Sequence, residues 1–271
     1  MPELPEVETI KRDLEQLIVG KKILSLETNS AKQVLPSPEK VKKEVAGTKI
    51  EKIGRRAKIL QIFLDNKKVL AIHLKMTGRL LVRKKTDPPD EWQRTTLSLS
   101  NNLELRFADL RKFGWIKLLE GEEDLKKISA ELGPEPLVDL NLQKFQEIIS
   151  YRSRPIKLIL MDQKIIAGIG NIYANEALFL AKIDPRRPAN KLKKKEMKTL
   201  FSAIEKVLRA GLENRGASDN HYRDALGRKG SYQKHFLIYG KKDESCLNCQ
   251  GKIKRIILGG RGTFFCPKCQ K

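Results

Sequence analysis

The chain has 271 residues, of which 40% are hydrophobic, so it can bury one large core or two smaller ones. Its 55 Lys and Arg residues outnumber 33 Asp and Glu residues, and the resulting charge of +22 predicts attraction to a polyanion. No stretch approaches the roughly 20 apolar residues of a membrane span. The charged start is unlike a secretory signal, and no basic amphipathic helix dominates, so nucleic acid is favoured over an anionic membrane.

The chain begins Met1-Pro2-Glu3, which places a carboxylate beside a potential N-terminal amine. If Met1 is removed, Pro2 carries a free secondary amine, and α-amines have pKa values of about 7.7–8.0. A usable fraction is then neutral at physiological pH and can form a Schiff base with a sugar or carbonyl carbon. The alternative is an ordinary start, in which Pro2 and Pro5 only delay a helix that begins near Glu6.

The segment up to Leu119 is predicted to be mostly β-structure. Helical spacing of apolar residues from Val7 predicts a first amphipathic helix that ends at Gly20, and Ser37-Pro38 predicts the start of a short second one. Short alternating runs then suggest a β-sandwich or barrel. The expected strands are Lys22–Glu27, Lys49–Ile53, Ile59–Leu64, Val69–Leu74, Leu80–Arg83, Thr95–Leu99, Leu103–Phe107 and Trp115–Leu119.

From Gly121 the pattern changes to helices, with an expected interdomain linker at 132–136. Residues 214–239 have little apolar periodicity and are predicted to form a long loop, of a length that is usually functional or mobile. The expected helices are Leu142–Ser150, Pro155–Asp162, Ile172–Ala181 and Leu192–Glu213.

All four cysteines lie in two Cys-x-x-Cys pairs, Cys246 with Cys249 and Cys266 with Cys269. The 16 residues between the pairs are about what a β-hairpin needs to bring four thiolates around a tetrahedral ion, with its tip at 259–262. Four protein ligands leave no position for water, so the pattern predicts one structural Zn²⁺ ion. Redox dithiols or disulfides are the alternative, and the clustering argues against a secreted disulfide framework.

Three separate segments resemble the bacterial formamidopyrimidine-DNA glycosylases: PELPEVET at 2–9, GIGNIYA at 168–174, and the cysteine cluster. The resemblance covers essentially the whole chain. It implies an α+β fold with an N-terminal eight-stranded β-sandwich and flanking helices, then a helical helix-two-turns-helix domain that ends in a zinc-binding β-hairpin. The implied domains are a catalytic domain at 1–131, a DNA-binding domain with the lesion-recognition loop at 132–240, and a four-cysteine zinc finger at 241–271.

The resemblance also implies a catalytic set. Pro2 would attack C1′ of the damaged nucleotide, and Glu3 would protonate the sugar ring oxygen. Lys58 would act as an acid and phosphate contact, although a solvated basic run is an alternative for its segment. Arg261, at the tip of the zinc hairpin, would clamp phosphates and assist δ-elimination. Glu6 would orient the site, or simply stabilise the start of a helix.

A lesion inside a duplex must be flipped out, and the resemblance assigns Met76, Arg111 and Phe113 to fill the space that it leaves. Two apolar side chains can unstack neighbouring bases, and an arginine can hydrogen-bond the orphaned base. Core positions are the usual alternative for a lone Met or Phe, but both lie beside Gly and basic residues in turn-like segments.

The remaining implied DNA contacts are to phosphates. Asn171 follows a Gly-x-Gly turn at a helix start, where N–H groups and the helix dipole can bind an anion, although a plain tight turn is the alternative. His73, Arg152 and Lys157 match further phosphate contacts, and a structural histidine is the rival interpretation for His73.

The chain departs from the usual family pattern in two places. The lesion-recognition loop at 216–221 lacks the paired glycines and hydroxyl residues of many relatives, and the segment 92–94 lacks their histidines. The first departure leaves the base preference open, and the second puts one phosphate contact in doubt.

These observations predict a bifunctional DNA glycosylase and abasic-site lyase that excises oxidised purines and cleaves the strand by β,δ-elimination. Its expected partner is double-stranded DNA with oxidised bases, its cofactor one zinc ion, and its setting the bacterial cytoplasm near the nucleoid, as a monomer without a membrane partner. An endonuclease VIII-like enzyme for oxidised pyrimidines is one alternative. A non-catalytic damaged-DNA-binding protein is the other.

Overall fold

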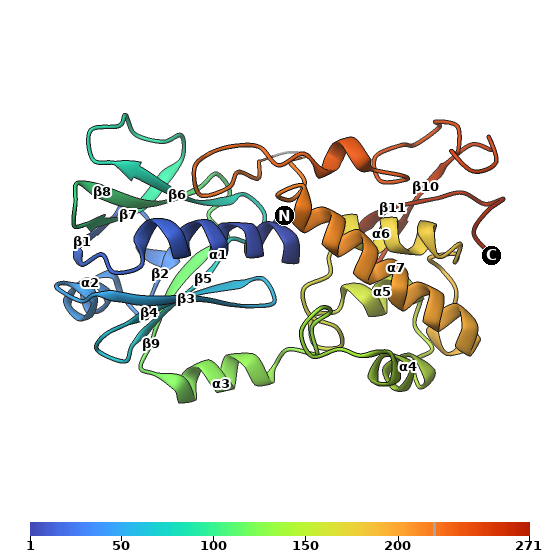
Figure 1. Cartoon of the computed structure of the whole chain (residues 1–271), viewed down its shortest axis with the longest axis horizontal. Helices are drawn as coiled ribbons and strands as arrows, with labels where there is room; N and C mark the ends of the chain where they lie inside the picture. Colours follow the sequence, from blue (N-terminus) through green and yellow to red (C-terminus); the bar gives the residue numbers. More distant parts are fainter. Residues whose placement is uncertain (219–220) are drawn as a thin grey trace. The chain divides into compact units, whose positions relative to one another are not determined.

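The computed structural model describes residues 1–218 and 221–271, and these residues form two compact units. The first unit contains 1–130 and 214–233, and the second contains 131–213 and 234–271. Figure 1 labels the helices and strands along the chain. The segment 214–233 thus groups with the N-terminal unit, while the expected domain limits at 131 and 240 stay a prediction. No helix of the described residues is long and apolar enough to cross a membrane.

The first unit is a β-sandwich with helices at its sides. Its described strands pair into sheets of order β1-β7-β8-β6 and β2-β9-β5-β4-β3, antiparallel except for β2 with β9. Its elements are α1 (Leu4–Ile18), β1 (Ile23–Thr28), β2 (Val34–Leu35), α2 (Pro38–Val45), β3 (Ile50–Arg56), β4 (Ile59–Leu64), β5 (Val69–His73), β6 (Gly78–Lys84), β7 (Gln93–Leu99), β8 (Leu103–Asp109), β9 (Trp115–Leu119) and α3 (Glu122–Ala130).

Helices α1 and α2 close the two open sides of the sandwich. Helix α1 packs against the edge strands β3 and β6, as Figure 1 shows, and α2 packs against the edge strands β1 and β2. The apolar stripe of α1 explains this position, because Ile10, Leu14 and Ile18 are fully buried. Side chains from both sheets and both helices form one continuous core.

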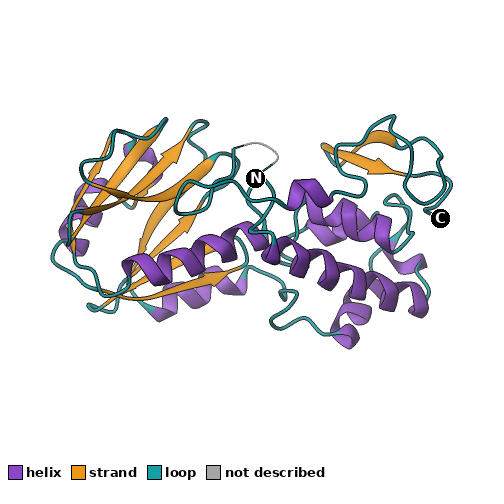
Figure 2. Cartoon of the chain, turned by 45° about the horizontal axis from the view of Figure 1, so that its top comes forward, coloured by secondary structure: helices purple, strands orange, loops and turns teal. Residues whose placement is uncertain are grey.

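The second unit is helical and ends in a hairpin, whose strands are orange in Figure 2. Its central helix α6 is apolar nearly all round, and every residue from 172 to 179 is buried, because α5, α7 and β11 pack around it. Its elements are α4 (Leu142–Ser150), α5 (Ile156–Met161), α6 (Asn171–Leu180), α7 (Lys194–Glu213), β10 (Lys254–Leu258) and β11 (Arg261–Phe265).

The expected fold class is confirmed, with two local differences. The segment 132–136 is not a free linker, because Gly133 N–H donates to Gln163 O at 2.9 Å and Ala167 N–H donates to Pro134 O at 3.0 Å. The hairpin tip is shorter than expected: Leu258 pairs with Arg261, so only Gly259-Gly260 form the turn. Both glycines have positive φ, as the type I′ two-residue hairpin turn requires. Arg261 is therefore the first residue of β11.

Candidate functional site

The N-terminus of α1 carries two buried carboxylates. Helix α1 begins at Leu4, so Glu3 is its N-cap and Pro2, which is buried, precedes the helix directly. Glu6 accepts the N–H of Glu3 at 2.8 Å, and the Glu3 side chain accepts the N–H of Glu6 in return. This reciprocal pair is a capping box, which satisfies N–H groups at the helix start and orients both side chains. The i, i+3 spacing of the two glutamates was the sequence signal for it.

Glu6 also binds the segment that follows α7. Its second carboxylate oxygen accepts the N–H of Ala217 at 2.7 Å, and the Tyr222 hydroxyl donates to the Glu6 carbonyl at 3.4 Å. Gly216, at a φ of +82°, lets the backbone come this close, because a Cβ there would lie 2.8 Å from the Glu6 side chain. The two residues Asp219 and Asn220 of the expected lesion-recognition loop lie outside the described residues.

An ion-pair cluster joins the segment 214–233, which follows α7, to helix α1. The Arg215 guanidinium donates to both carboxylate oxygens of Asp13, at 2.8 and 2.7 Å, and to Asp224 at 2.7 Å. Asp224 also accepts from Arg228 at 2.9 Å. Burial alone would raise the pKa of Asp224, but these arginines outweigh that effect and lower it. Sequence reasoning missed the cluster, since its members are up to 215 positions apart.

Lys58 lies in the tight turn between β3 and β4, and its side chain is only 4% exposed. Arg55 connects this turn to α1, because it donates to Glu8 at 2.9 Å and to the carbonyl of Ala57 at 2.8 Å. Burial by itself would raise the pKa of Glu8, but Arg55 and Arg12 hold it below its usual value. The chain therefore holds Lys58 beside the N-terminal half of α1.

His73 is at the end of β5, opposite Ile59 of β4, and near Lys58. Its Nδ1 accepts the N–H of Lys75 at 2.9 Å. Burial lowers the pKa of His73 to about 3, and the positive charges of Lys75 and Lys58 contribute to the same shift. The imidazole is therefore neutral at physiological pH.

The structure brings the three expected wedge residues together at one end of the sandwich. Gly78 of β6 pairs with Asp109 of β8, so the turn that carries Met76 lies beside the loop that carries Arg111 and Phe113. Phe113 is 53% exposed, and the Arg111 guanidinium lies 4.6 Å from its ring centroid. An exposed aromatic ring with a cation over its face is unlike a core position and is free to meet a ligand.

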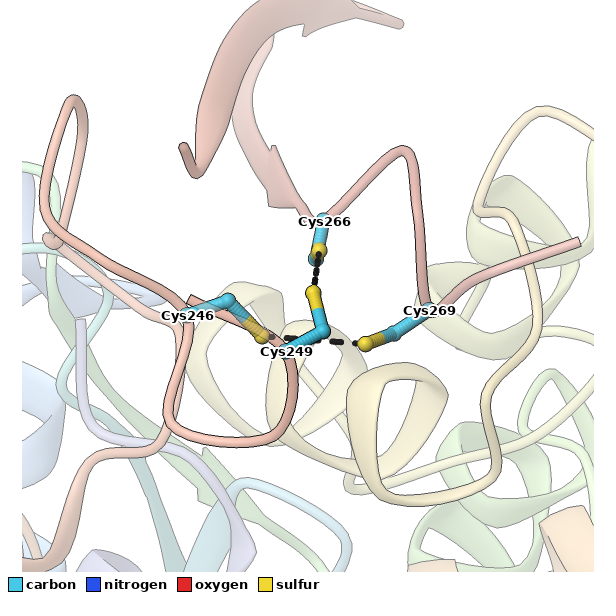
Figure 3. Close-up of side chains that lie close together, drawn as sticks. All are labelled: Cys246, Cys249, Cys266 and Cys269. Atoms are coloured by element: carbon cyan, nitrogen blue, oxygen red, sulfur yellow. Dashed lines mark hydrogen bonds between the residues drawn. The ribbon is translucent and has the colours of Figure 1, made fainter. Parts of the chain in front are cut away.

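The four cysteines of the second unit form a compact sulfur cluster, shown in Figure 3. All four Sγ atoms lie within 4.8 Å of one another, with 3.8 Å from Cys246 to Cys269 and 3.5 Å from Cys249 to Cys266. A tetrahedral zinc ion with Zn–S bonds of about 2.3 Å needs sulfurs about 3.8 Å apart. The donor set therefore fits one structural Zn²⁺ ion, as expected from the sequence.

Helices α5 and α6 hold the hairpin strand β11 through buried polar contacts. The Asn171 side chain donates to the carbonyl of Gly262 at 3.1 Å, and Asn175 accepts the N–H of Phe264 at 2.8 Å. Lys157 donates to the same Gly262 carbonyl at 3.1 Å and to the hydroxyl of Thr263 at 2.7 Å. These contacts place the exposed Arg261 next to the start of α6.

All four expected phosphate contacts have protein partners in this structure, and those of His73 and Asn171 are Lys75 and Gly262. Lys157 is fully buried against the hairpin, and Arg152 donates to the carbonyl of Ile148 in α4. Arg152 is half-buried, so part of it still faces solvent. The expected site residues thus form one set in each unit: Pro2, Glu3, Lys58, His73, Met76, Arg111 and Phe113 in the first, and Arg152, Lys157, Asn171, Arg261 and the cysteines in the second.

Three family models match the chain in order. They are the formamidopyrimidine-DNA glycosylase N-terminal domain over 1–116, the formamidopyrimidine-DNA glycosylase H2TH domain over 132–222, and the zinc finger found in FPG and IleRS over 243–271. The first matched segment contains the N-terminus of α1 with its two buried glutamates. The second contains α5 and α6, which hold β11, and the third contains the four-cysteine sulfur cluster.

Curated relatives and solved structures agree along the full length. A protein of Herpetosiphon aurantiacus named formamidopyrimidine-DNA glycosylase is 44% identical over 273 residues, covering all of both chains. Its namesake from Bacillus subtilis is 39% identical and covers 100% of this chain and 99% of the relative. The structure of a Lactococcus lactis FPG mutant in complex with Fapy-dG-containing DNA matches with a TM-score of 0.94, at 37% identity and full coverage of both chains.

Proposed function

Because the chain belongs to the formamidopyrimidine-DNA glycosylase family and is a DNA-repair glycosylase, we propose that it excises oxidised purines through Pro2 and then cleaves the strand. The lesions are 8-oxoguanine and formamidopyrimidines in double-stranded DNA. The observation that carries the proposal is the buried start of α1, where Pro2 precedes a capping box of two glutamates.

The covalent step uses the α-amine that Pro2 gains once Met1 is removed. Its nitrogen attacks C1′, the N-glycosidic bond breaks, and the damaged base leaves with the bonding electron pair and takes up the proton that the amine releases. Glu3 donates a proton to the sugar ring oxygen, so the ring opens and an iminium ion joins Pro2 to the sugar. Lys58 and Arg261 then assist the β- and δ-eliminations that release the sugar from the strand.

Duplex DNA is engaged by a wedge and by phosphate contacts. Met76, Arg111 and Phe113 enter the space that the flipped nucleotide leaves, which the exposure of Phe113 supports.

Among the phosphate contacts, Arg261 supplies an exposed cation. His73 supplies a neutral N–H donor. Asn171 lies at the N-terminus of α6, where backbone N–H groups bind anions. The half-buried Arg152 adds positive potential, and Lys157 holds the Gly262 carbonyl next to Arg261.

The biological setting is part of the same proposal. We place the protein in the bacterial cytoplasm with chromosomal DNA, as a monomer whose three domains end at 131, 240 and 271. The four-cysteine zinc finger stabilises the hairpin that presents Arg261 and takes no part in the chemistry, because its four thiolates fill the coordination of one ion.

An imine intermediate can be trapped, and trapping tests the proposal. The protein is incubated with borohydride and duplexes that carry 8-oxoguanine opposite cytosine or an oxidised pyrimidine. A reduced covalent complex with the purine lesion is expected. The pyrimidine duplex belongs in the test because a Lactococcus lactis FPG has been solved with oxidised pyrimidine-containing DNA. Trapping with that duplex alone would move the protein to the endonuclease VIII-like class.

The amine itself is tested with an insertion. One residue inserted between Met1 and Pro2 turns the Pro2 nitrogen into an amide and displaces the α-amine by about 3.8 Å. Trapping should be lost while binding to the lesion duplex remains. Pro5→Gly is the matched control, since it alters a second proline of the same segment and leaves the amine in place. Unchanged trapping by the insertion variant would refute N-terminal catalysis. Intact binding without trapping by the natural chain would support the non-catalytic alternative.

A further inference from the structure

Asp109, the last residue of β8, is fully buried between the two segments that carry the wedge residues. One carboxylate oxygen, Oδ1, accepts the hydroxyl of Thr77 and the backbone N–H of Arg111, the latter at 3.2 Å. The other, Oδ2, accepts the N–H of Gly114 at 2.8 Å and the side-chain amide of Gln33 at 3.1 Å. A single carboxylate therefore joins the Met76 turn to both ends of the Arg111–Phe113 loop.

The backbone of Asp109 is also fixed, so the carboxylate is a firm anchor. Its N–H donates to the carbonyl of Trp92 at 3.0 Å, and its carbonyl accepts from the Arg94 side chain at 3.0 Å. Thr77 strengthens the junction, because its hydroxyl oxygen also accepts the Arg111 N–H at 3.1 Å. Hydrogen bonds to a carboxylate are roughly twice as strong as neutral ones, and a network of four restrains both the half-buried Met76 turn and the exposed Arg111–Phe113 loop.

We propose that Asp109 is the positioning residue of the wedge: it holds the Met76 turn and the Arg111–Phe113 loop in one fixed arrangement for entry into the duplex. The proposal rests on the wedge role assigned above. A rigid wedge loses little conformational freedom when it enters DNA, because the conformational entropy of its loops is already lost when the protein folds. Asp109 itself touches no base in this account and acts through Thr77, Arg111 and Gly114.

The acceptor pattern makes Asp109→Asn a specific test. An amide has one acceptor oxygen and one NH2 donor, whereas all four partners of the carboxylate can donate. The NH2 group should turn toward Thr77, because a hydroxyl can rotate to accept. Arg111 N–H then loses the side chain at position 109 and keeps only the Thr77 hydroxyl, so the junction between the two loops is weakened without a change in side-chain size.

Thr77→Val removes the same junction from the other side and keeps the shape of the residue. It also decides the question if Asp109→Asn does not fold. The matched control is Thr95→Val in β7, which likewise removes a buried hydroxyl, one that contacts Thr28 at 2.9 Å in the same unit. Phe113→Ala serves as the reference for loss of the wedge.

Unstacking of a base by the wedge is measured on a duplex from which no base is excised. The probe is a duplex with a tetrahydrofuran abasic analogue next to 2-aminopurine, whose fluorescence rises when protein insertion unstacks it. At saturating protein we expect Asp109→Asn and Thr77→Val to lose most of the rise, as Phe113→Ala does, while Thr95→Val keeps it. Excision of 8-oxoguanine from a duplex should fall about tenfold in both, equivalent to about 1.4 kcal/mol, with little change in cleavage of single-stranded abasic DNA.

Different results would overturn the positioning role of Asp109 and the proposed glycosylase activity. A full fluorescence rise with Asp109→Asn and Thr77→Val overturns the positioning role, as does an equal loss of duplex and single-strand activity. Combining either variant with Phe113→Ala should add little further loss, and full additivity also overturns the role. If the natural chain unstacks the probe but excises nothing, the glycosylase assignment fails and the positioning role stands.

Discussion

At the scale of single residues, the surroundings of His73 decide what it can contribute to DNA binding. Its Nδ1 accepts a backbone N–H, so the proton of the neutral ring is on Nε2. With a pKa of about 3, the ring carries no charge between pH 5 and 8. As a phosphate contact it therefore supplies one N–H donor and no charge, which sequence alone could not have distinguished from a cationic histidine.

The free energy of unfolding should depend on pH through this residue. An unfolded histidine has a pKa of about 6.5, so below that pH the unfolded chain binds a proton that the folded chain, with its pKa of about 3, does not. Stability is then full above about pH 6.5 and falls as the pH falls, by up to about 1.4 kcal/mol per pH unit.

We expect His73→Gln, which keeps an N–H donor and cannot titrate, to lose most of that slope between pH 6 and 5. Urea unfolding at each pH measures it. Tryptophan fluorescence reports the first unit alone, because Trp92 and Trp115 are the two tryptophans of the chain. Equal slopes for the two proteins would contradict the depressed pKa of His73.

Some residues of the candidate site could be proposed from sequence and others could not, for a physical reason. Pro2, Glu3 and the cysteines belong to short local motifs whose spacing is visible in the chain. Asp109 is a common residue type in an unremarkable position, and its importance arises from partners between 2 and 76 positions away. Such roles exist only once the strands have paired.

At the scale of elements, α6 supports the zinc hairpin through Asn175. This side chain is buried and supplies the acceptor for the N–H of Phe264 in β11. Asn175→Ala should leave that donor unpaired and destabilise the second unit by about 1–3 kcal/mol. The hairpin should also open more often, so zinc passes faster to a chelator.

A colorimetric chelator measures the zinc release rate, and thermal unfolding measures the stability. Gln143→Ala is the matched control, because Gln143 is exposed on α4 and its side chain contacts only its own helix neighbour Glu147 in the described hydrogen bonds. An unchanged release rate for Asn175→Ala would mean that the sulfur cluster alone holds the hairpin.

The elements themselves were largely predictable, with exceptions that have structural causes. Helix α4 has the expected bounds because it carries a strong apolar stripe after a clear N-cap, Asn141. Strand β2 was missed, since two residues that pair in parallel with β9 show no periodicity. The segment 214–233 reads as a loop, yet Tyr222 and Ala225 join the core of the sandwich.

At the scale of the whole molecule, the charge of +22 is spread over both units, so charge alone does not locate the DNA-binding surface. Exposed cations on α7, such as Arg209, have no assigned role, while Arg261 is presented by a hairpin that several buried contacts hold in place. A rigidly placed cation can neutralise a defined phosphate, whereas a mobile one mainly raises the local potential.

Salt dependence separates these two kinds of cation. Each phosphate that the protein neutralises contributes about −0.9 to the slope of log K against log salt concentration. Fluorescence anisotropy with an abasic-analogue duplex should therefore give a steep slope for the natural chain, and Arg261→Ala should make it shallower by about 0.9. Arg209→Ala should leave the slope nearly unchanged, and so should His73→Gln, because a neutral donor releases no counterion. An equal change for Arg209→Ala and Arg261→Ala would mean that binding follows total charge, and the phosphate contact proposed for Arg261 would fail.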